Sequence, residues 1–130
     1  MKRTGTRFRP RLAQDHYDAI VIGSGIGGLT TAALLAKLGK RVCVLEQHYT
    51  AGGYTHSYER EGYEWDVGVH YIGEVHKPWT VLRRVFDVIS DNQLQWEPMD
   101  DPFDRIILGD LTFDYVAGRD FRVVHFGGYT

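Results

Sequence analysis

The sequence predicts an α/β fold built on one strand–helix–strand unit near the N-terminus. Three observations carry this expectation. A β-branched run at residues 18–22 precedes a glycine-rich turn, a helix-forming stretch covers residues 27–38, and a second apolar run occupies residues 41–45. Short apolar runs of this kind are typical of parallel strands, which are buried on both faces. Beyond this unit, the chain predicts the start of an inserted, mostly β region.

The turn between the first strand and the helix carries a Gly-x-Gly-x-x-Gly pattern. Its members are Gly23, Ser24, Gly25, Ile26, Gly27 and Gly28. The first glycine of such a pattern permits a tight turn, the second lets backbone approach a pyrophosphate, and the third lets the helix pack close to the sheet. Together with the flanking strand and helix, the pattern predicts a Rossmann-like dinucleotide site. The alternative is a glycine cluster in an ordinary turn.

An acidic residue follows the second strand. Glu46 lies close to the spacing at which a carboxylate accepts hydrogen bonds from an adenosine ribose. A carboxylate suits a free 2′-hydroxyl and repels a 2′-phosphate, so the site should hold FAD or NAD and not NADP. Gln47 and then the pair Gly52-Gly53 follow, and the pair predicts a second stretch of bare backbone beside an extended cofactor. The alternative for that pair is a flexible loop.

These motifs resemble the N-terminus of the phytoene desaturase-related flavoproteins, and within them the retinol saturase and carotenoid isomerase branch. The similar segments are Gly23–Leu29, Leu45–His48, Ala51–Gly53, Asp66–Gly73, Leu94–Met99 and Pro102–Asp104. The resemblance implies an FAD enzyme that adds, removes or rearranges double bonds in an apolar polyene or related lipid. It also implies that Gly23, Gly25, Gly28, Glu46, Gly52 and Gly53 contact FAD.

Members of these flavoproteins are several-fold longer than this chain. The chain is therefore expected to be the N-terminal part of a larger enzyme, inactive alone, with the C-terminal flavin-binding part missing. It departs from retinol saturases at Tyr54-Thr55, where those enzymes tend to carry a cysteine pair.

Two other functions stay open on the residues alone. A non-catalytic lipid escort protein, similar to the Rab escort and GDP-dissociation inhibitor proteins, would use the same fold without flavin. An NAD-dependent dehydrogenase would use the same glycine loop and the same acidic residue. Bound flavin is the observation that separates these alternatives from the FAD enzyme.

Composition and charge limit the kinds of partner that the chain is expected to bind. The chain is 43% hydrophobic and 25% charged with a net charge of −2, which suits a globular protein without general affinity for nucleic acid. Basic residues concentrate in residues 1–16, which predict a disordered leader or, alternatively, an arm that meets anionic lipid headgroups. No apolar run approaches the ~18 residues of a membrane span. A cytoplasmic location, with peripheral membrane contact as an option, is the expectation.

The expected domains are the leader at 1–16, the FAD-binding unit at 17–75 and a substrate-side region at 76–130. Strands are expected at residues 54–58 and 63–67, an amphipathic helix opening at Pro78, and a tight type II′ hairpin around Gly109-Asp110.

Several further side chains carry competing interpretations. The aromatic residues Tyr54, Tyr58, Tyr63, Trp65 and Tyr71 either line a channel for a polyene or pack in a core. His70 is a candidate proton donor or acceptor near a flavin, and the alternative is a structural histidine. The histidines lack metal-ligand spacing and the one cysteine, Cys43, lies in an apolar strand, so no metal site is expected.

Overall fold

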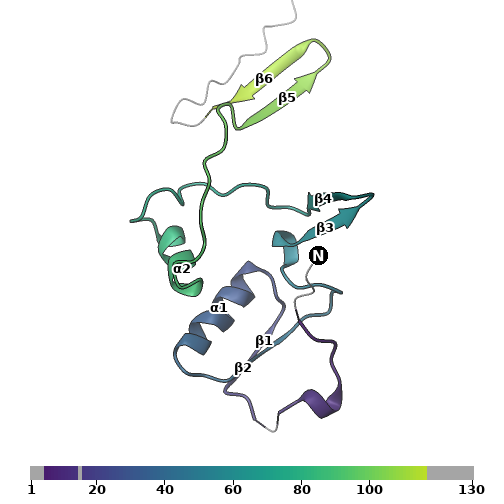
Figure 1. Cartoon of the computed structure of the whole chain (residues 1–130), viewed down its shortest axis with the longest axis vertical. Coiled ribbons are helices and arrows are strands. Elements are labelled where there is room, and N and C mark those ends of the chain that lie inside the picture. The colour runs from purple at the N-terminus through teal and green to yellow at the C-terminus, as the bar shows by residue number, and fades with distance from the viewer. Residues whose placement is uncertain (1–4, 15, 117–130) are drawn as a thin grey trace, which may run out of the picture. The chain divides into compact units, whose positions relative to one another are not determined.

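The computed structural model describes residues 5–14 and 16–116 of the chain (Figure 1). It divides into two compact units, one extending to Gln95 and the other beginning at Trp96. Each unit has its own sheets, and the candidate site lies in the first.

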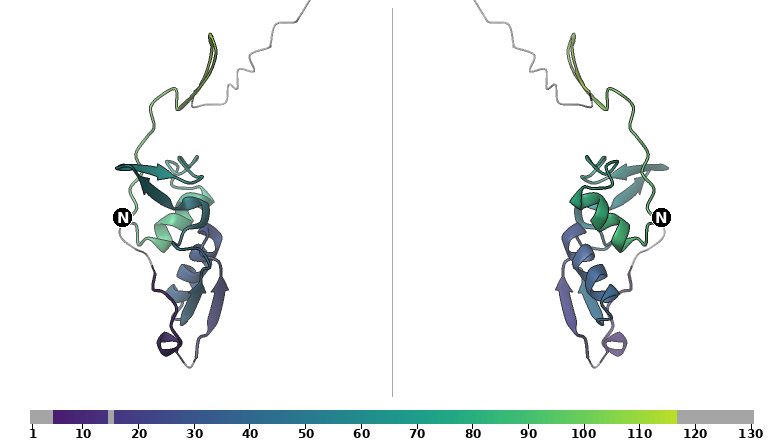
Figure 2. Two further views of the ribbon diagram at one scale, coloured as in Figure 1. Left: turned by 90° about the vertical axis from the view of Figure 1, so that its right-hand side faces the viewer. Right: turned by 90° about the vertical axis from the view of Figure 1, so that its left-hand side faces the viewer.

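The first unit is organised around a parallel strand–helix–strand unit. It consists of β1 (Ala19–Ile22), α1 (Ile26–Lys37) and β2 (Val42–Leu45). The register runs from Ala19 opposite Val42 to Ile22 opposite Leu45. Because two parallel strands need a crossover, α1 connects them and packs against the sheet (Figures 1 and 2). The predicted α/β fold is confirmed.

The two faces of β1 have different surroundings. Ala19 and Val21 are half-buried, whereas Ile20 and Ile22 are 60% and 87% exposed. Successive side chains of a strand point to opposite faces, so the two isoleucines share the face away from α1. An apolar strand face therefore remains open on the side opposite the helix.

A second helix, α2 (Val81–Ile89), contacts α1 and supplies part of a small core. The buried apolar residues in the described part of the chain are Ala32, Val75 and Phe86. The predicted helix start at Pro78 was early, because Thr80 is the N-cap. Its hydroxyl accepts a hydrogen bond from the Arg83 N–H, which satisfies one of the free donors of the first turn.

An antiparallel pair follows the strand–helix–strand unit. A 3₁₀ turn, η2 (Gly53–Thr55), precedes β3 (Ser57–Arg60) and β4 (Tyr63–Asp66). The strand predicted at residues 54–58 was wrong in its first half. There the Thr55 hydroxyl donates to the Gly52 carbonyl at 2.6 Å, and Gly52 has a φ of 122°, which together bend the chain into a turn.

The second unit contains one hairpin, β5 (Asp104–Leu108) and β6 (Leu111–Tyr115). Gly109 has a φ of 60°, and Asp110 is not among the described residues with positive φ. A positive φ at the first turn position alone fits the predicted type II′ turn. Across the hairpin, Arg105 donates two hydrogen bonds to the Asp114 carboxylate, at 2.5 and 2.9 Å.

Candidate functional site

The glycine loop between β1 and α1 forms one wall of the candidate site. Gly23 has a φ of 94°, and its N–H donates to the Leu45 carbonyl at 2.7 Å. The helix begins directly afterwards, with Gly25 as its N-cap, no side-chain cap and no acidic residue in its first turn. The first N–H groups of α1 therefore lack side-chain acceptors, as an anion-binding helix end requires.

Two glycines of the loop have distinct roles in this geometry. A Cβ at Gly28 would lie 2.2 Å from the Gly23 carbonyl oxygen, so only glycine lets α1 pack against the turn. A Cβ at Gly25 would meet nothing within 4 Å. The predicted packing role of Gly28 is confirmed, and the space beside Gly25 is the space that a ligand needs for a close approach to the backbone.

Glu46 is held at the end of β2 by three hydrogen bonds. Its Oε2 accepts from the Ser24 N–H at 2.8 Å and from the Ser24 hydroxyl at 2.6 Å, and its Oε1 accepts from the His48 N–H at 2.7 Å. The Ser24 hydroxyl bond is the largest cause that lowers the pKa of Glu46 to about 2. The carboxylate is thus charged at neutral pH, and it keeps lone pairs for further donors such as ribose hydroxyls.

The second glycine pair packs directly against the first glycine loop. Gly52 forms a parallel bridge with Gly25, and its N–H donates to the Ser24 carbonyl at 3.1 Å and to the Ser24 hydroxyl at 3.2 Å. Gly53 has a φ of 57°, and a Cβ there would lie 2.9 Å from the Gly25 Cα. The two glycine segments are therefore one structural unit and not independent loops.

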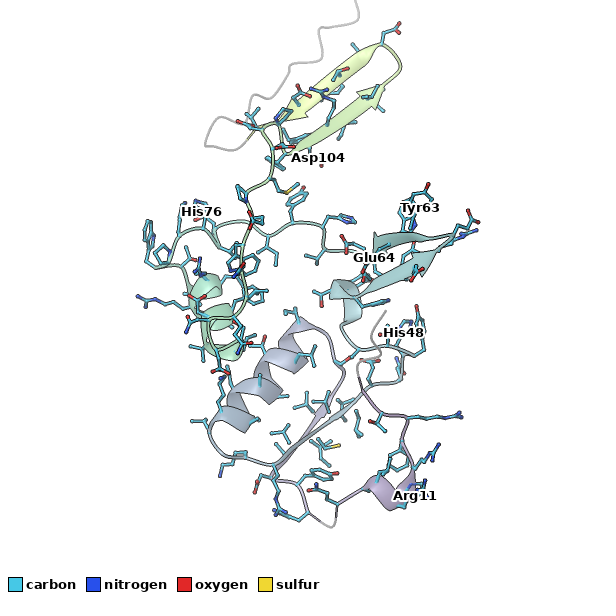
Figure 3. The ribbon with its side chains drawn as sticks, viewed as in Figure 1. Arg11, His48, Tyr63, Glu64, His76 and Asp104 are labelled. Atoms are coloured by element: carbon cyan, nitrogen blue, oxygen red, sulfur yellow. The ribbon has the colours of Figure 1, made fainter. Side chains whose placement is uncertain are left out.

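A large open hollow of about 1030 Å³ lies over these residues, here called the β1–β2 hollow. Ser24, Glu46 and Gln47 line it at the carboxyl ends of the strands, and Ile20 and Ile22 line it along the open face of β1. Ligands of open α/β sheets bind outside the carboxyl ends of the strands. In Figure 3, His48 marks the loop after β2 that borders the hollow.

The other predicted cofactor-binding residues lie near the glycine loop or Glu46, and they differ in how exposed they are. Ile26 and Gly27 open α1, and Gln47 lies exposed beside Glu46. Ser24 is 1% exposed, and its hydroxyl is engaged with Glu46. A contact between each of these residues and a cofactor stays a prediction.

His70 lies apart from the lining of the β1–β2 hollow. Its Nδ1 is 3.7 Å from the Asp66 carboxylate, and its side chain is 62% exposed. Two other histidines, His48 and His56, have ring centroids 5.1 Å apart near the second glycine pair. Across the described ranges, no group of three metal-ligating side chains comes together.

The aromatic cluster of the sequence lies mostly at the surface of this unit. Tyr54 is 77% exposed and Trp65 is 53% exposed. A Cβ at Gly68 would lie 2.9 Å from the Tyr54 ring, so the tyrosine packs over that glycine. The choice between a channel lining and interior packing stays open.

Two features of the site were missed from the sequence. The first is the bond between Ser24 and Glu46, which joins residues too far apart for a local pattern to pair them. The second is the segment Gly5–Ala13, several residues of which line the β1–β2 hollow. The segment is recognisably basic in sequence, but it has no helical or strand periodicity from which its contact with the sheet could be predicted.

Comparison with known proteins identifies the class. Residues 21–88 match the family described as NAD(P)-binding Rossmann-like domain, and the chain belongs to this family. The match and the geometry of the loop support a dinucleotide as the cofactor.

Individual relatives indicate the branch of flavoproteins to which the chain is most similar. The chain is 55% identical over 101 residues to all-trans-retinol 13,14-reductase of Danio rerio, a match that covers 76% of the chain and 16% of the relative. It is 51% identical over 109 residues to the protein of that name from Rattus norvegicus, covering 81% and 18%. It is 60% identical over 52 residues to the chloroplastic prolycopene isomerase of Arabidopsis thaliana, covering 40% and 9%.

These relatives confirm the resemblance to the retinol saturase and carotenoid isomerase branch of the phytoene desaturase-related proteins. The chain spans less than a fifth of the length of the retinol reductases that it matches. Within the part of the chain that the structure describes, no helix is long and apolar enough to cross a membrane.

Proposed function

We propose that the protein is an FAD-dependent oxidoreductase that acts on the double bonds of a polyene or related lipid, and that this chain supplies the site for the ADP half of FAD. The observation that carries the proposal is the unit formed by the first glycine loop, Glu46 and Gly52-Gly53. The names of the relatives, retinol reductase and prolycopene isomerase, support the substrate class.

The residues present fit such a cofactor. Gly28 keeps α1 against the turn, and the helix N-terminus and the open backbone at Gly25 suit a pyrophosphate. Glu46 suits the ribose because Ser24 and the His48 N–H hold the carboxylate charged and in one orientation. Gly23 and Gly25 with Glu46, Gly52 and Gly53 would therefore hold the nucleotide.

FAD is favoured over NAD by the second glycine pair. Gly52 bridges to Gly25, so bare backbone continues past the ribose carboxylate alongside the first loop. An extended cofactor uses such a continuation. The apolar face at Ile20 and Ile22 forms one wall of the hollow.

When bound, FAD supplies the transfer of a hydride to or from a conjugated or allylic carbon. The chain contributes binding, orientation and the charge of Glu46. His70 stays a candidate for holding or moving a proton, and the structure shows only its contact with Asp66. A cytoplasmic location and a peripheral membrane contact stay predictions of the sequence.

The test is a visible absorption spectrum of the purified protein, followed by assays with all-trans-retinol and with a carotenoid. Flavin bands that are released as FAD on denaturation, together with a change in polyene absorbance, are the expected results. A colourless protein that binds a polyene would favour the lipid-escort function. Binding of NAD without flavin would favour the dehydrogenase.

A further inference from the structure

The N-terminal segment Gly5–Leu12, here called the strap, lies against the candidate nucleotide site. Gly5, Thr6, Arg7, Phe8 and Leu12 line the β1–β2 hollow together with Ser24 and Glu46. In Figure 1 the strap is the dark purple segment, which ends in the turn η1 (Pro10–Leu12). In Figure 3 it runs between His48 and Arg11. A segment outside the strand–helix–strand unit thus forms a second wall of its ligand site.

Without the strap, the hollow lacks positive side chains to offset the negative charges of a bound pyrophosphate. Glu46 is held as an anion, and a pyrophosphate adds two negative charges to the same region. The helix N-terminus offsets only about half a charge. Among the described residues that line the hollow, Arg7 is the one arginine or lysine. The strand–helix–strand unit itself contributes no such side chain to this lining.

Arginine suits this task by its chemistry. Its guanidinium is charged at any working pH and presents a planar set of donors that binds phosphate oxygens in pairs. Arg7 is exposed, and it forms no ion pair with another residue in the described part of the chain, so it is available to an anion that enters the hollow.

We propose that Arg7 is a nucleotide-binding residue that the strap places over the glycine loop, where it binds the pyrophosphate of the dinucleotide. This inference rests on the proposed function, because it assigns a further residue to the same site. It extends that site beyond the strand–helix–strand unit, so that residues before β1 take part in cofactor binding.

The strap contains its own control. Arg9 and Arg11 belong to the same basic segment and share with Arg7 a smaller hollow of about 360 Å³ formed by strap residues, but only Arg7 of the three also lines the β1–β2 hollow. Arg9→Ala removes the same charge two positions away without touching the β1–β2 hollow. The pair Arg7→Ala and Arg9→Ala therefore separates a direct contact from the general effect of positive charge.

The experiment is calorimetric titration of the purified protein, stripped of nucleotide, with FAD and with ADP. Arg7→Ala should weaken both affinities by about tenfold, the size of one lost charge-assisted contact, while Arg9→Ala changes them less than about twofold. Arg7→Lys should restore part of the affinity, since the charge returns without the planar donors. The wild-type affinity should also fall more steeply with salt than that of Arg7→Ala.

Equal losses in Arg7→Ala and Arg9→Ala would overturn the contact in favour of a general charge effect. Unchanged affinity in Arg7→Ala, with phosphatidylserine vesicle binding lost in both variants, would assign the strap to a lipid surface. In either case wild-type binding of FAD would leave the proposed function standing. A folded wild-type protein that binds neither FAD nor ADP would overturn both proposals, and circular dichroism checks that each variant is folded.

Discussion

Ser24 and Glu46 are joined by two hydrogen bonds, one from the serine backbone N–H and one from its hydroxyl, both to the same carboxylate oxygen. The contact links the turn after β1 to the end of β2. It holds the carboxylate in one orientation beside the glycine loop, while the other carboxylate oxygen accepts from the His48 N–H. Orientation of the acidic residue is therefore set by the motif that also forms the loop.

Ser24→Ala should weaken binding of FAD or ADP by severalfold, because Glu46 loses its shortest hydrogen bond and its preferred orientation. The pKa of Glu46 should rise toward its ordinary value of 4.5, since the hydroxyl bond is the main cause of its lowering. Calorimetry measures the affinity, and a side-chain NMR titration measures the pKa. Thr31→Ala is the control, because that hydroxyl bonds only the Gly27 carbonyl within α1.

Glu46→Gln should alter the dependence of stability on pH. The folded pKa of Glu46, about 2, lies below its ordinary value of 4.5. Its contribution to stability is therefore present above pH about 4.5 and is lost as the pH falls toward about 2. Denaturant unfolding across this range should show a shallower loss for Glu46→Gln than for the wild type. A slope unchanged by the substitution, with Glu61→Gln as the comparison, would contradict the assignment.

Gly28→Ala should destabilise the glycine loop, while Gly27→Ala should not. The new methyl of Gly28→Ala meets the Gly23 carbonyl oxygen at 2.2 Å, and overpacking of this kind costs ~1–3 kcal/mol. Gly27→Ala points into open space, and alanine favours the helix by up to ~1 kcal/mol. Thermal unfolding compares the two variants. A Gly27→Ala variant as unstable as Gly28→Ala would show that the contact distance is not the cause.

Gly53→Ala should reduce nucleotide affinity as well as stability. The residue has a φ of 57°, and its methyl would press on the Gly25 Cα, which lies at the proposed pyrophosphate site. Gly62 provides a matched position, since its φ is 80° but a methyl there meets nothing within 4 Å. Both substitutions carry the backbone cost of ~1–2 kcal/mol for a left-handed alanine. Only Gly53→Ala should also weaken ADP binding in calorimetry; an equal effect of Gly62→Ala would refute this.

Local patterns predicted the parts of the fold that depend on neighbours in sequence. The strand at Ala19–Ile22 and the helix at Ile26–Lys37 lie within a residue of their predicted limits. Both were predictable because apolar runs indicate regular elements and the glycines beside them indicate where these elements end. The tight turn at Gly109 was found for the same reason.

Features that depend on distant contacts were not predictable in this way. The 3₁₀ turn at Gly53–Thr55 arises where Gly52 packs on the Gly25 backbone, so the strand predicted from residue 54 does not form in its first half. The placement of the strap against the hollow likewise rests on packing between separated segments. The spacing after the glycine loop singled out Glu46 as the candidate ribose-binding carboxylate. Its hydrogen bonds to Ser24 are visible only in the three-dimensional fold.

The bridge between Gly25 and Gly52 also bears on how the protein is made. Every hydrogen bond described here for Glu46 and the two glycine segments joins residues that precede Ser57. During translation, domains form from the N-terminus as the chain emerges. The two glycine segments and Glu46 can therefore come together during translation before the β5–β6 hairpin has been synthesised.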